Sequence, residues 1–492
     1  MKSHKNLING EWVASKTGKV FRDVNPSDRR DVIGLAQRSG PADIEWAVRA
    51  AREALPAWMA MPAPKRAMIL FKSAQILEER KEELSLLMIR EMGKTLKETR
   101  GDVQEAIDTA YFFAGEGRRL YGHTVPSELK NKMCLTVRRP IGVCGLITPW
   151  NFPLAIPSWK VYPALICGNT VVLKPAEDTP ILALLFGEIL MEAGLPKGVC
   201  NVVTGFGEEA GAALVKHRDV SMISFTGSSK VGSLIAASCG KNLKRVSLEM
   251  GGKNPQIVLE DADLPLAVDA ALWGAFATSG QRCTATSRVI VHQKVYDRFL
   301  RLFLERVKKV KVGPASDPST EVGPIINPKQ LRQIHRHVQR ARREGAKLVC
   351  GGKIDAEGDK KNGSFYRPTV FTNVSPKMKI AQEEVFGPVV AFIKVKDYEE
   401  AVRVVNDSFY GLSSSVFTRD VSRAIKSVEG IQSGITYINA STIGAEAHLP
   451  FGGVKRSGHG QREAGVTALD IFSEWKTIYI DYSGRVQRAQ ID

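Results

Sequence analysis

The sequence predicts an α/β protein built on a doubly wound parallel sheet, followed by a second α/β unit. Short apolar, β-branched segments that end at Pro or Gly alternate with segments whose apolar residues recur at helical spacing. The strand-like segments are apolar on both faces, which is typical of parallel strands covered by helices on both sides. The chain has 492 residues, 43% of them hydrophobic, and so exceeds what one core usually organises.

Four segments in the first half of the chain are predicted to be strands of the first sheet. They are GVCGLITPW, TVVLKP, VCNVVTG and SMISFTG, at residues 142–150, 170–175, 199–205 and 221–227. Helical periodicity separates them at residues 180–194 and 207–217. Helices between strands are the crossovers that a parallel sheet requires.

A second alternating series predicts the other α/β unit. Its strand-like segments are PQIVLED, SRVIVH and GPVVAFIKV, at residues 255–261, 287–292 and 387–395. The basic segment 332–347, RQIHRHVQRARREGAK, has helical character, and DAEGDKKNGS at 355–364 is predicted to be an exposed turn.

The net charge of +17 raises the alternative of a nucleic-acid-binding protein, most of all at residues 332–347. That segment has no interleaved aromatic residues for base stacking and no recognisable binding motif, so a solvated helix face is the better interpretation. We therefore expect no nucleic-acid partner. A basic surface would still attract anionic substrates and cofactors.

The beginning of the chain and its cysteines bear on the compartment. The first residues, MKSHKNLINGEWV, lack the apolar run of a signal peptide, and no segment approaches the ~18 uninterrupted apolar residues of a membrane span. We expect a cytoplasmic protein without membrane contact. The seven cysteines lack CxxC spacing, and their odd number fits no complete intrachain disulfide framework or zinc site, so we expect reduced thiols and no metal.

Residues at the carboxyl ends of parallel strands are the first binding candidates. FTGSSKVG follows the fourth strand and opens a helix, so we expect the N–H groups of Gly227 and Ser228 to face outward, where they and the helix dipole could hold a pyrophosphate. A simple cap is the alternative. GFGEEAG, which contains Gly207, misses the dinucleotide-binding spacing by one residue and is also compatible with a turn.

LKPAE ends another predicted strand with a cation and an anion. Lys174 could bond a ribose hydroxyl or a phosphate, and Glu177 could accept from both hydroxyls of an adenine ribose. A glutamate at that place would repel a 2′-phosphate. A surface ion pair is the alternative.

Seven motifs occur in order along the chain. They are TPWNFPL (148–154), KPAE (174–177), FTGSSKVG (225–232), LEMGGKNP (248–255), SGQRC (279–283), EEVFGPV (383–389) and PFGGVKRSGHG (450–460). Together they resemble the aldehyde dehydrogenase superfamily, from INGEWV at 8–13 to EWKTIYIDY at 474–482.

The resemblance implies a domain organisation. It places a Rossmann-type NAD-binding domain at residues 1–117 and 141–251 and an α/β catalytic domain at 252–466. A small β-rich oligomerisation element, at 118–140 and 467–492, would assemble homodimers or homotetramers. The alternating TIYIDY at 477–482 is consistent with a strand offered for pairing.

The resemblance also assigns three catalytic roles that aldehyde oxidation needs. A carbonyl has no hydride to lose until a thiolate, here Cys283, converts it to a tetrahedral carbon that bears an oxyanion. The Asn151 amide would stabilise that oxyanion, and Glu249, with room beside Gly251, would activate the water that releases the acid from a thioester. Arg282 could lower the pKa of the neighbouring thiol. Outside this motif set, the same residues would be a buried thiol, a turn residue and a strand-end carboxylate.

NAD is the implied cofactor, with NADP possible. Glu177 favours NAD, whereas Lys230 stands where relatives often carry an acid. Glu384 and Phe386 match positions that hold the nicotinamide ribose and ring. The other cofactor candidates are Thr148, Pro149, Trp150, Lys174, Gly207, Phe225, Gly227, Ser228 and Gly251.

The aldehyde substrate is predicted from positions within matching motifs. The expected lining residues are Phe152, Trp159, Ala277, Arg282, Thr284, Ala445 and Phe451. Trp159 stands where succinate-semialdehyde enzymes commonly carry arginine, and Ala277 leaves space for a longer or polar chain. GAEAHLPFGG at 444–453 and GQREAG at 460–465 look closer to branches that oxidise carboxylated semialdehydes. We therefore predict a semialdehyde such as 2-oxoglutarate semialdehyde, anchored by Arg282; a broad aliphatic or aromatic range is the alternative.

Two further alternatives share the fold. A CoA-acylating enzyme would use the same cysteine, but relatives of that type usually lack the glutamate seen here as Glu249. A structural use of the fold would tolerate loss of Asn151, Glu249 or Cys283, and all three are present.

Overall fold

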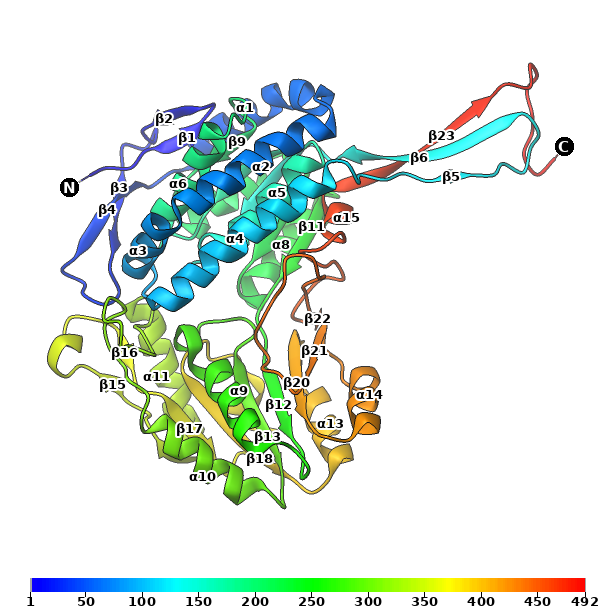
Figure 1. Ribbon diagram of the computed structural model, residues 1–492. Coiled ribbons are helices and arrows are strands. Elements are labelled where there is room, and N and C mark those ends of the chain that lie inside the picture. Colours follow the sequence, from blue (N-terminus) through cyan, green and yellow to red (C-terminus); the bar gives the residue numbers. More distant parts are fainter. Residues whose placement is uncertain (1, 492) are drawn as a thin grey trace.

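Two seven-stranded sheets, each covered by helices, and a projecting arm make up the computed structural model, which describes residues 2–491 (Figure 1). Strands up to residue 249 form the first sheet, apart from the arm and a small hairpin, and the second sheet begins at residue 254. The predicted α/β class, with a doubly wound first unit, is confirmed.

The first sheet has the order β11-β10-β7-β8-β9-β1-β2. Its strands are β1 (Asn6–Ile8), β2 (Glu11–Val13), β7 (Val143–Ile147), β8 (Thr170–Lys174), β9 (Cys200–Val202), β10 (Met222–Thr226) and β11 (Arg245–Glu249). The strands β7 to β11 pair in parallel, whereas β1 pairs antiparallel with β9 and β2. The predicted parallel strands are therefore present, and the sequence did not reveal the antiparallel edge.

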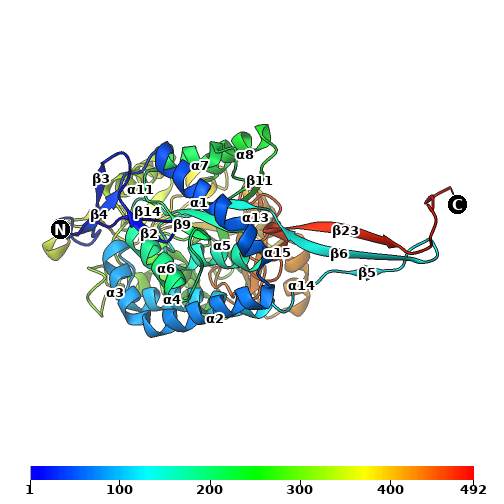
Figure 2. The same cartoon turned by 90° about the horizontal axis from the view of Figure 1, so that it is seen from above.

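Helices cover both faces of this sheet, as Figure 2 shows from above. They are α1 (Pro41–Ala60), α2 (Ala63–Glu79), α3 (Lys81–Glu91), α4 (Leu96–Glu116), α5 (Ala155–Ile166), α6 (Pro180–Glu192), α7 (Ala212–Lys216) and α8 (Ser229–Lys241). Leu146 belongs to the core cluster that contains residues of α2, α4, α5 and α6, and its neighbour Ile147 belongs to the cluster of α1, α7 and α8 on the other face. The helix predicted at 207–217 begins with a π-helical turn, Gly207–Gly211.

The second sheet has the order β14-β17-β18-β13-β12-β20-β21. Its strands are β12 (Asn254–Val258), β13 (Thr286–His292), β14 (Lys347–Cys350), β17 (Thr369–Thr372), β18 (Val389–Val395), β20 (Ser413–Phe417) and β21 (Ile435–Ile438). Its helices are α9 (Leu264–Phe276), α10 (Tyr296–Val307), α11 (Pro328–Arg343), α13 (Tyr398–Asn406) and α14 (Val421–Gly430). In α11 the buried residues are Leu331, Ile334, Val338 and Ala341, so the basic residues of segment 332–347 line the solvent side, as expected.

The remaining elements are short or belong to the arm. They are β3 (Val20–Val24), β4 (Val32–Gln37), β15 (Ile354–Asp355), β16 (Phe365–Tyr366), α12 (Lys379–Gln382), β19 (Tyr410–Gly411), β22 (Val454–Lys455), α15 (Ala468–Ile471) and the 3-10 turns Ala277–Gly280 and Gly358–Lys360. The segment 355–364 is largely exposed, although Asp355 and Ser364 at its ends are buried. In the arm, β6 (Lys132–Pro140) is the central strand. It pairs antiparallel with β23 (Ser473–Asp481) on one side and with β5 (Thr124–Val125) on the other.

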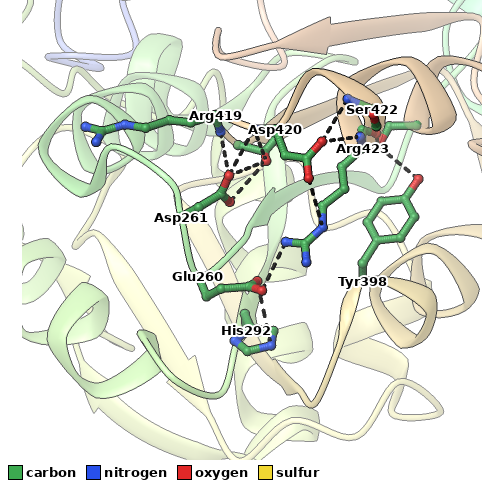
Figure 3. Close-up of polar contacts among 10 residues, drawn as sticks. Glu260, Asp261, His292, Tyr398, Arg419, Asp420, Ser422 and Arg423 are labelled. Atoms are coloured by element: carbon green, nitrogen blue, oxygen red, sulfur yellow. Dashed lines mark hydrogen bonds and ion pairs between the residues drawn. The ribbon is translucent and has the colours of Figure 1, made fainter.

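The two sheets present opposite ends to each other. Thr148 and Glu249 lie at the carboxyl ends of β7 and β11, whereas Lys253 and Ala285 lie just before the amino ends of β12 and β13. A polar network closes the carboxyl ends of β12 and β20 (Figure 3). In it, Asp261 accepts hydrogen bonds from Thr418 Oγ1 at 2.8 Å and from the N–H of Arg419 at 2.8 Å. The rule that ligands bind at carboxyl ends therefore identifies site residues in the first sheet only.

None of the helices between residues 2 and 491 combines the length and the apolar character that crossing a lipid bilayer requires.

Candidate active site

A cavity of about 1120 Å³ is lined by residues of both sheet units and by the first turns of α4. Cys283 and Glu249 line it. So do the residues predicted to contact substrate, which are Phe152, Trp159, Ala277, Arg282, Thr284, Ala445 and Phe451. The structure thus brings together side chains that are far apart in the sequence. Within residues 2–491, no three His, Cys, Asp or Glu side chains are grouped so as to hold a metal ion.

The loop before Cys283 has an unusual backbone. Thr278 and Ser279 have φ values of 52° and 56°, in the left-handed region that side chains other than glycine seldom occupy. Ser279 Oγ donates to the carbonyl of Gly323 at 2.7 Å, and Gln281 Nε2 donates to that of Pro324 at 3.2 Å. Distant parts of the chain therefore hold this loop in place.

The Cys283 thiol is only partly exposed. Burial, followed by the nearby carboxylates of Glu384 and Glu249, raises the pKa of Cys283 to about 12. The charge of Arg282 has a smaller, opposite effect, and its Nε donates to Thr278 Oγ1 at 2.9 Å. Arg282 lowers the pKa of the thiol, as expected, but burial and the two carboxylates raise it by more.

Asn151 follows β7 and is buried. Its Nδ2 donates to the carbonyl of Gln281 at 3.0 Å, so the amide lies against the loop that carries Cys283. The ring of the next residue, Phe152, has Lys94 Nζ 3.4 Å and Arg282 Cζ 5.2 Å from its centroid. The hydrogen bond of Asn151 and the two cations beside the Phe152 ring therefore hold the segment 151–152 in place.

Glu249 ends β11 and is buried with no hydrogen-bond partner for either carboxylate oxygen among the described residues. Burial, together with the charge of Glu463, raises the pKa of Glu249 well above its usual range. A Cβ at Gly452 would lie 2.5 Å from Glu249 Oε1, so glycine makes room for the carboxylate there. The space expected beside Gly251 belongs to another side chain, because a Cβ there would lie 2.0 Å from Glu384 Oε2.

Several predicted cofactor residues gather at the carboxyl edge of the first sheet. The Thr148 N–H donates to the carbonyl of Lys174 at 3.2 Å. Lys174 is buried, its Nζ donates to the carbonyl of Gly205 at 3.0 Å, and it lies 3.6 Å from Glu177 Oε2. The Glu177 side chain is 36% exposed, so it remains open to a ligand.

A second group of predicted cofactor residues lies closer to Cys283. Trp150, which follows Pro149 after β7, meets the ring of Phe386 edge to face at 5.3 Å. Glu384 Oε1 accepts the Gly252 N–H at 3.0 Å. Burial raises the pKa of Glu384 to about 7, while the Gly252 N–H and Lys253 oppose this shift.

The helix start at FTGSSKVG differs from its prediction. The Gly227 N–H does not face outward, because it donates to the carbonyl of Glu249 at 3.0 Å. Ser228 caps α8 by accepting from the Val231 N–H at 3.4 Å. A Cβ at Gly227 would lie 2.5 Å from Phe225 Cζ, so this glycine admits the Phe225 ring. Gly207 has open space around it.

The residues around the start of α4 were not predicted to belong to the site. Lys94 and Asp102 form a fully buried ion pair at 2.7 Å, and Asp102 also accepts the Ala155 N–H that begins α5. Glu98 and Glu105 line the cavity. The pattern Thr-x-x-Glu at 95–98 is a capping-box signature and would have located the start of this helix, but not its neighbours in space.

Comparisons with known proteins agree with this arrangement. The model of the Aldehyde dehydrogenase family matches residues 12–478. The chain is 44% identical to the alpha-ketoglutaric semialdehyde dehydrogenase of Bacillus subtilis (strain 168), over 97% of this chain and 98% of that protein. It is also 44% identical to retinaldehyde dehydrogenase 3 of Homo sapiens, over 98% of this chain and 93% of that protein.

Among solved structures, betaine aldehyde dehydrogenase from Staphylococcus aureus in complex with NAD+ matches with a TM-score of 0.96 and 36% identity, over 99% of this chain and 96% of that one. The chain therefore belongs to the aldehyde dehydrogenase family and is an oxidoreductase that acts on aldehydes.

Proposed function

We propose that this enzyme oxidises a semialdehyde with a distal carboxylate, such as 2-oxoglutarate semialdehyde, to the free acid with NAD. One observation carries the proposal: a single cavity is lined by Cys283, by Arg282 and by Glu249, whose carboxylate has no hydrogen-bond partner among residues 2–491. The names of the relatives from Bacillus subtilis and Haloferax volcanii, both alpha-ketoglutarate-type semialdehyde dehydrogenases, support this substrate class.

Cys283 is the proposed nucleophile. Its sulfur attacks the aldehyde carbon, a C–S bond forms, and the carbonyl π electrons move to the oxygen. The resulting oxyanion is stabilised by the Asn151 amide and the backbone N–H of Cys283, as the motif comparison implies. Because the pKa of the thiol is raised, the thiol must release its proton to solvent before the sulfur attacks, which leaves Glu249 unprotonated for the second half-reaction.

Glu249 is the proposed base of the second half-reaction. Loss of hydride from the thiohemiacetal leaves a thioester on Cys283. Glu249 removes a proton from water, which attacks the thioester; the C–S bond breaks, and the acid leaves with regeneration of the thiolate. A carboxylate with no hydrogen-bond partner among the described residues is free to move toward that water. Retention of this glutamate favours hydrolysis over transfer to CoA.

The residues at the carboxyl edge of the first sheet fit NAD. Bound NAD supplies the hydride acceptor. Glu177 and Lys174 would hold the adenine ribose, and Glu384 and Phe386 the nicotinamide ribose and ring. The buried Thr148 hydroxyl has no hydrogen-bond partner among residues 2–491, which fits a group that a ligand completes. The exposed carboxylate of Glu177 disfavours the 2′-phosphate of NADP.

Arg282 is the proposed anchor for the distal carboxylate. Its guanidinium packs on Phe152, and its side chain is 14% exposed, so a carboxylate that meets it would be largely desolvated. Trp159 and Phe451, whose rings meet at 4.8 Å, provide an apolar wall for the chain between the two ends of the substrate. The similarity to retinaldehyde dehydrogenase keeps a broad aldehyde range as the second candidate.

We further propose the domain roles implied by the motifs, with NAD binding at 1–117 and 141–251, catalysis at 252–466, and oligomerisation at 118–140 and 467–492. The arm supports the last role, because its apolar side chains are exposed. They include Val125, Met133, Trp475, Tyr479 and Ile480. A homodimer or homotetramer would cover them.

The test is kcat/KM for 2-oxoglutarate semialdehyde, succinate semialdehyde, glutamate semialdehyde, hexanal and benzaldehyde, each with NAD and with NADP. We expect 2-oxoglutarate semialdehyde with NAD to lead. If hexanal or benzaldehyde leads by tenfold, about 1.4 kcal/mol of transition-state binding favours the apolar chain, and the carboxylated substrate is wrong.

A further inference from the structure

One carboxylate, that of Glu98, joins the start of α4 to the loop that carries Cys283. Its Oε2 accepts from the N–H and the hydroxyl of Thr95, at 3.1 and 2.9 Å, which caps the helix. Its Oε1 accepts from the N–H and the hydroxyl of Thr278, at 2.5 and 3.3 Å. The Glu98 side chain therefore both caps α4 and contacts the loop that carries Cys283.

The loop needs such a contact because of its backbone. Thr278 has φ 52° and ψ 31°, and a β-branched residue pays a steric cost in that region. In the loop, the Thr278 N–H points to Glu98, and the next hydroxyl, of Ser279, donates to the carbonyl of Gly323. The direction of the chain at Thr278 decides where the residues up to Cys283 lie. A hydrogen bond to this N–H therefore bears on the position of the nucleophile.

The Thr278 hydroxyl extends the contact to the substrate wall. It accepts from Arg282 Nε at 2.9 Å and lies 3.3 Å from Glu98 Oε1. The order Arg282, Thr278, Glu98 is thus a hydrogen-bonded chain that ends on a carboxylate. Arg282 Nη2 is also 3.9 Å from Glu98 Oε1, which adds attraction between the two charges. This chain keeps the guanidinium over the Phe152 ring.

We propose that Glu98 is a positioning residue with two effects: through the Thr278 N–H it holds the Cys283 loop in its left-handed conformation, and through the Thr278 hydroxyl it directs Arg282 into the cavity. The proposal rests on the proposed roles of Cys283 and Arg282. The two effects should be separable by experiment. Loss of the contact to the Thr278 N–H should slow the reaction with every aldehyde, whereas loss of the contact to the Thr278 hydroxyl should weaken binding of carboxylated aldehydes only.

The first measurement is the pre-steady-state burst of NADH with hexanal and with 2-oxoglutarate semialdehyde. Glu98→Ala should slow the burst with both substrates by about tenfold or more, since a misplacement of about 1 Å can cost 10²-fold. Thr278→Ala keeps the N–H and removes the hydroxyl, so it should raise KM for the semialdehyde and leave the hexanal burst near the parent rate. Alkylation of Cys283 by iodoacetamide, followed without aldehyde, should be slower in Glu98→Ala.

Two further variants separate positioning from folding. Thr278→Gly added to Glu98→Ala should restore most of the hexanal burst, because glycine adopts a φ of 52° without outside help. Val103→Ala removes a buried side chain from α4 away from the loop, and should lower Tm with an unchanged burst.

Three results would overturn the proposal: parent burst and alkylation rates in Glu98→Ala, a burst in Val103→Ala as slow as in Glu98→Ala, or no recovery in the double variant. Cys283→Ala distinguishes a failure of the proposed function from a failure of the positioning role of Glu98. If it still forms NADH, the proposed function fails. If it is inactive while Glu98→Ala retains the parent rates, only the positioning role fails.

Discussion

Replacing Arg282 by glutamine should cost the enzyme its preference for carboxylated aldehydes while sparing uncharged ones. Glutamine can still donate from the position of the arginine Nε and so can keep the bond to Thr278 Oγ1. It lacks the two outer amino groups, Nη1 and Nη2, which are the groups proposed to meet a carboxylate. The variant therefore removes the proposed anchor with little change to the loop.

The magnitude follows from the surroundings of the guanidinium. Its side chain is 14% exposed and lies 5.2 Å from the Phe152 ring centroid, where water is largely excluded. A hydrogen bond to a charged group contributes about 1.5–3 kcal/mol, or roughly 10- to 150-fold in kcat/KM. We expect the lower half of this range for 2-oxoglutarate semialdehyde, because Glu98, 3.9 Å from Nη2, offsets part of the charge.

The assay compares initial rates of NADH formation with 2-oxoglutarate semialdehyde and hexanal in the same preparations. Hexanal is the internal control, because it has no carboxylate for the guanidinium of Arg282 to bind. Arg282→Lys, which keeps the charge without the planar fork, should fall between the parent and Arg282→Gln for the semialdehyde. An equal loss with both substrates would refute an anchoring role, as would an unchanged semialdehyde rate.

Three other predictions concern the remaining groups. Asn151→Ala should lower kcat about 10²- to 10³-fold in the acylation step if its amide meets the oxyanion, and an unchanged burst of NADH would exclude this role. Glu177→Ser should narrow the ratio of kcat/KM for NAD over NADP, and equal use of both cofactors by the parent would show that a cation dominates there. Because the pKa of Glu249 is raised, thioester hydrolysis should accelerate as pH rises above the ordinary carboxyl pKa of about 4.3, and Glu249→Gln should flatten that profile in single-turnover measurements.

The parallel strands could be predicted because both of their faces are buried, which leaves uninterrupted apolar runs such as those of β7, β8 and β10. Part of the first-sheet side of the site could be found for the same reason, since Lys174 stands at the end of a predicted strand, β8. Glu249, at the end of β11, is assigned from the motif resemblance, because β11 is not among the predicted strands.

The loop before Cys283 could not be predicted from its own residues. Thr278 and Ser279 have no preference for the left-handed region, and the groups that hold them belong to Glu98 and Gly323. The prediction of a free N–H at Gly227 was wrong for a similar reason, because this N–H donates to the carbonyl of Glu249 on the neighbouring strand. Local patterns do not contain such long-range hydrogen bonds.

The second sheet illustrates a limit of the topological rule. Its amino ends, beside Lys253 and Ala285, face the cavity, whereas its carboxyl ends are closed by the network around Asp261 and Arg423 (Figure 3). Which end of a sheet meets the site depends on how two units dock, and this depends on packing between them.

The most direct test of the account is the mass of Glu249→Gln after it is mixed with NAD and 2-oxoglutarate semialdehyde and quenched. We predict one NADH formed rapidly per active site, followed by slow turnover, and an acyl group on the peptide that contains Cys283. The same treatment of Cys283→Ala should give neither NADH nor adduct. Full steady-state turnover by the Glu249→Gln enzyme, or an adduct on another residue, would contradict the assignment of the nucleophile and base.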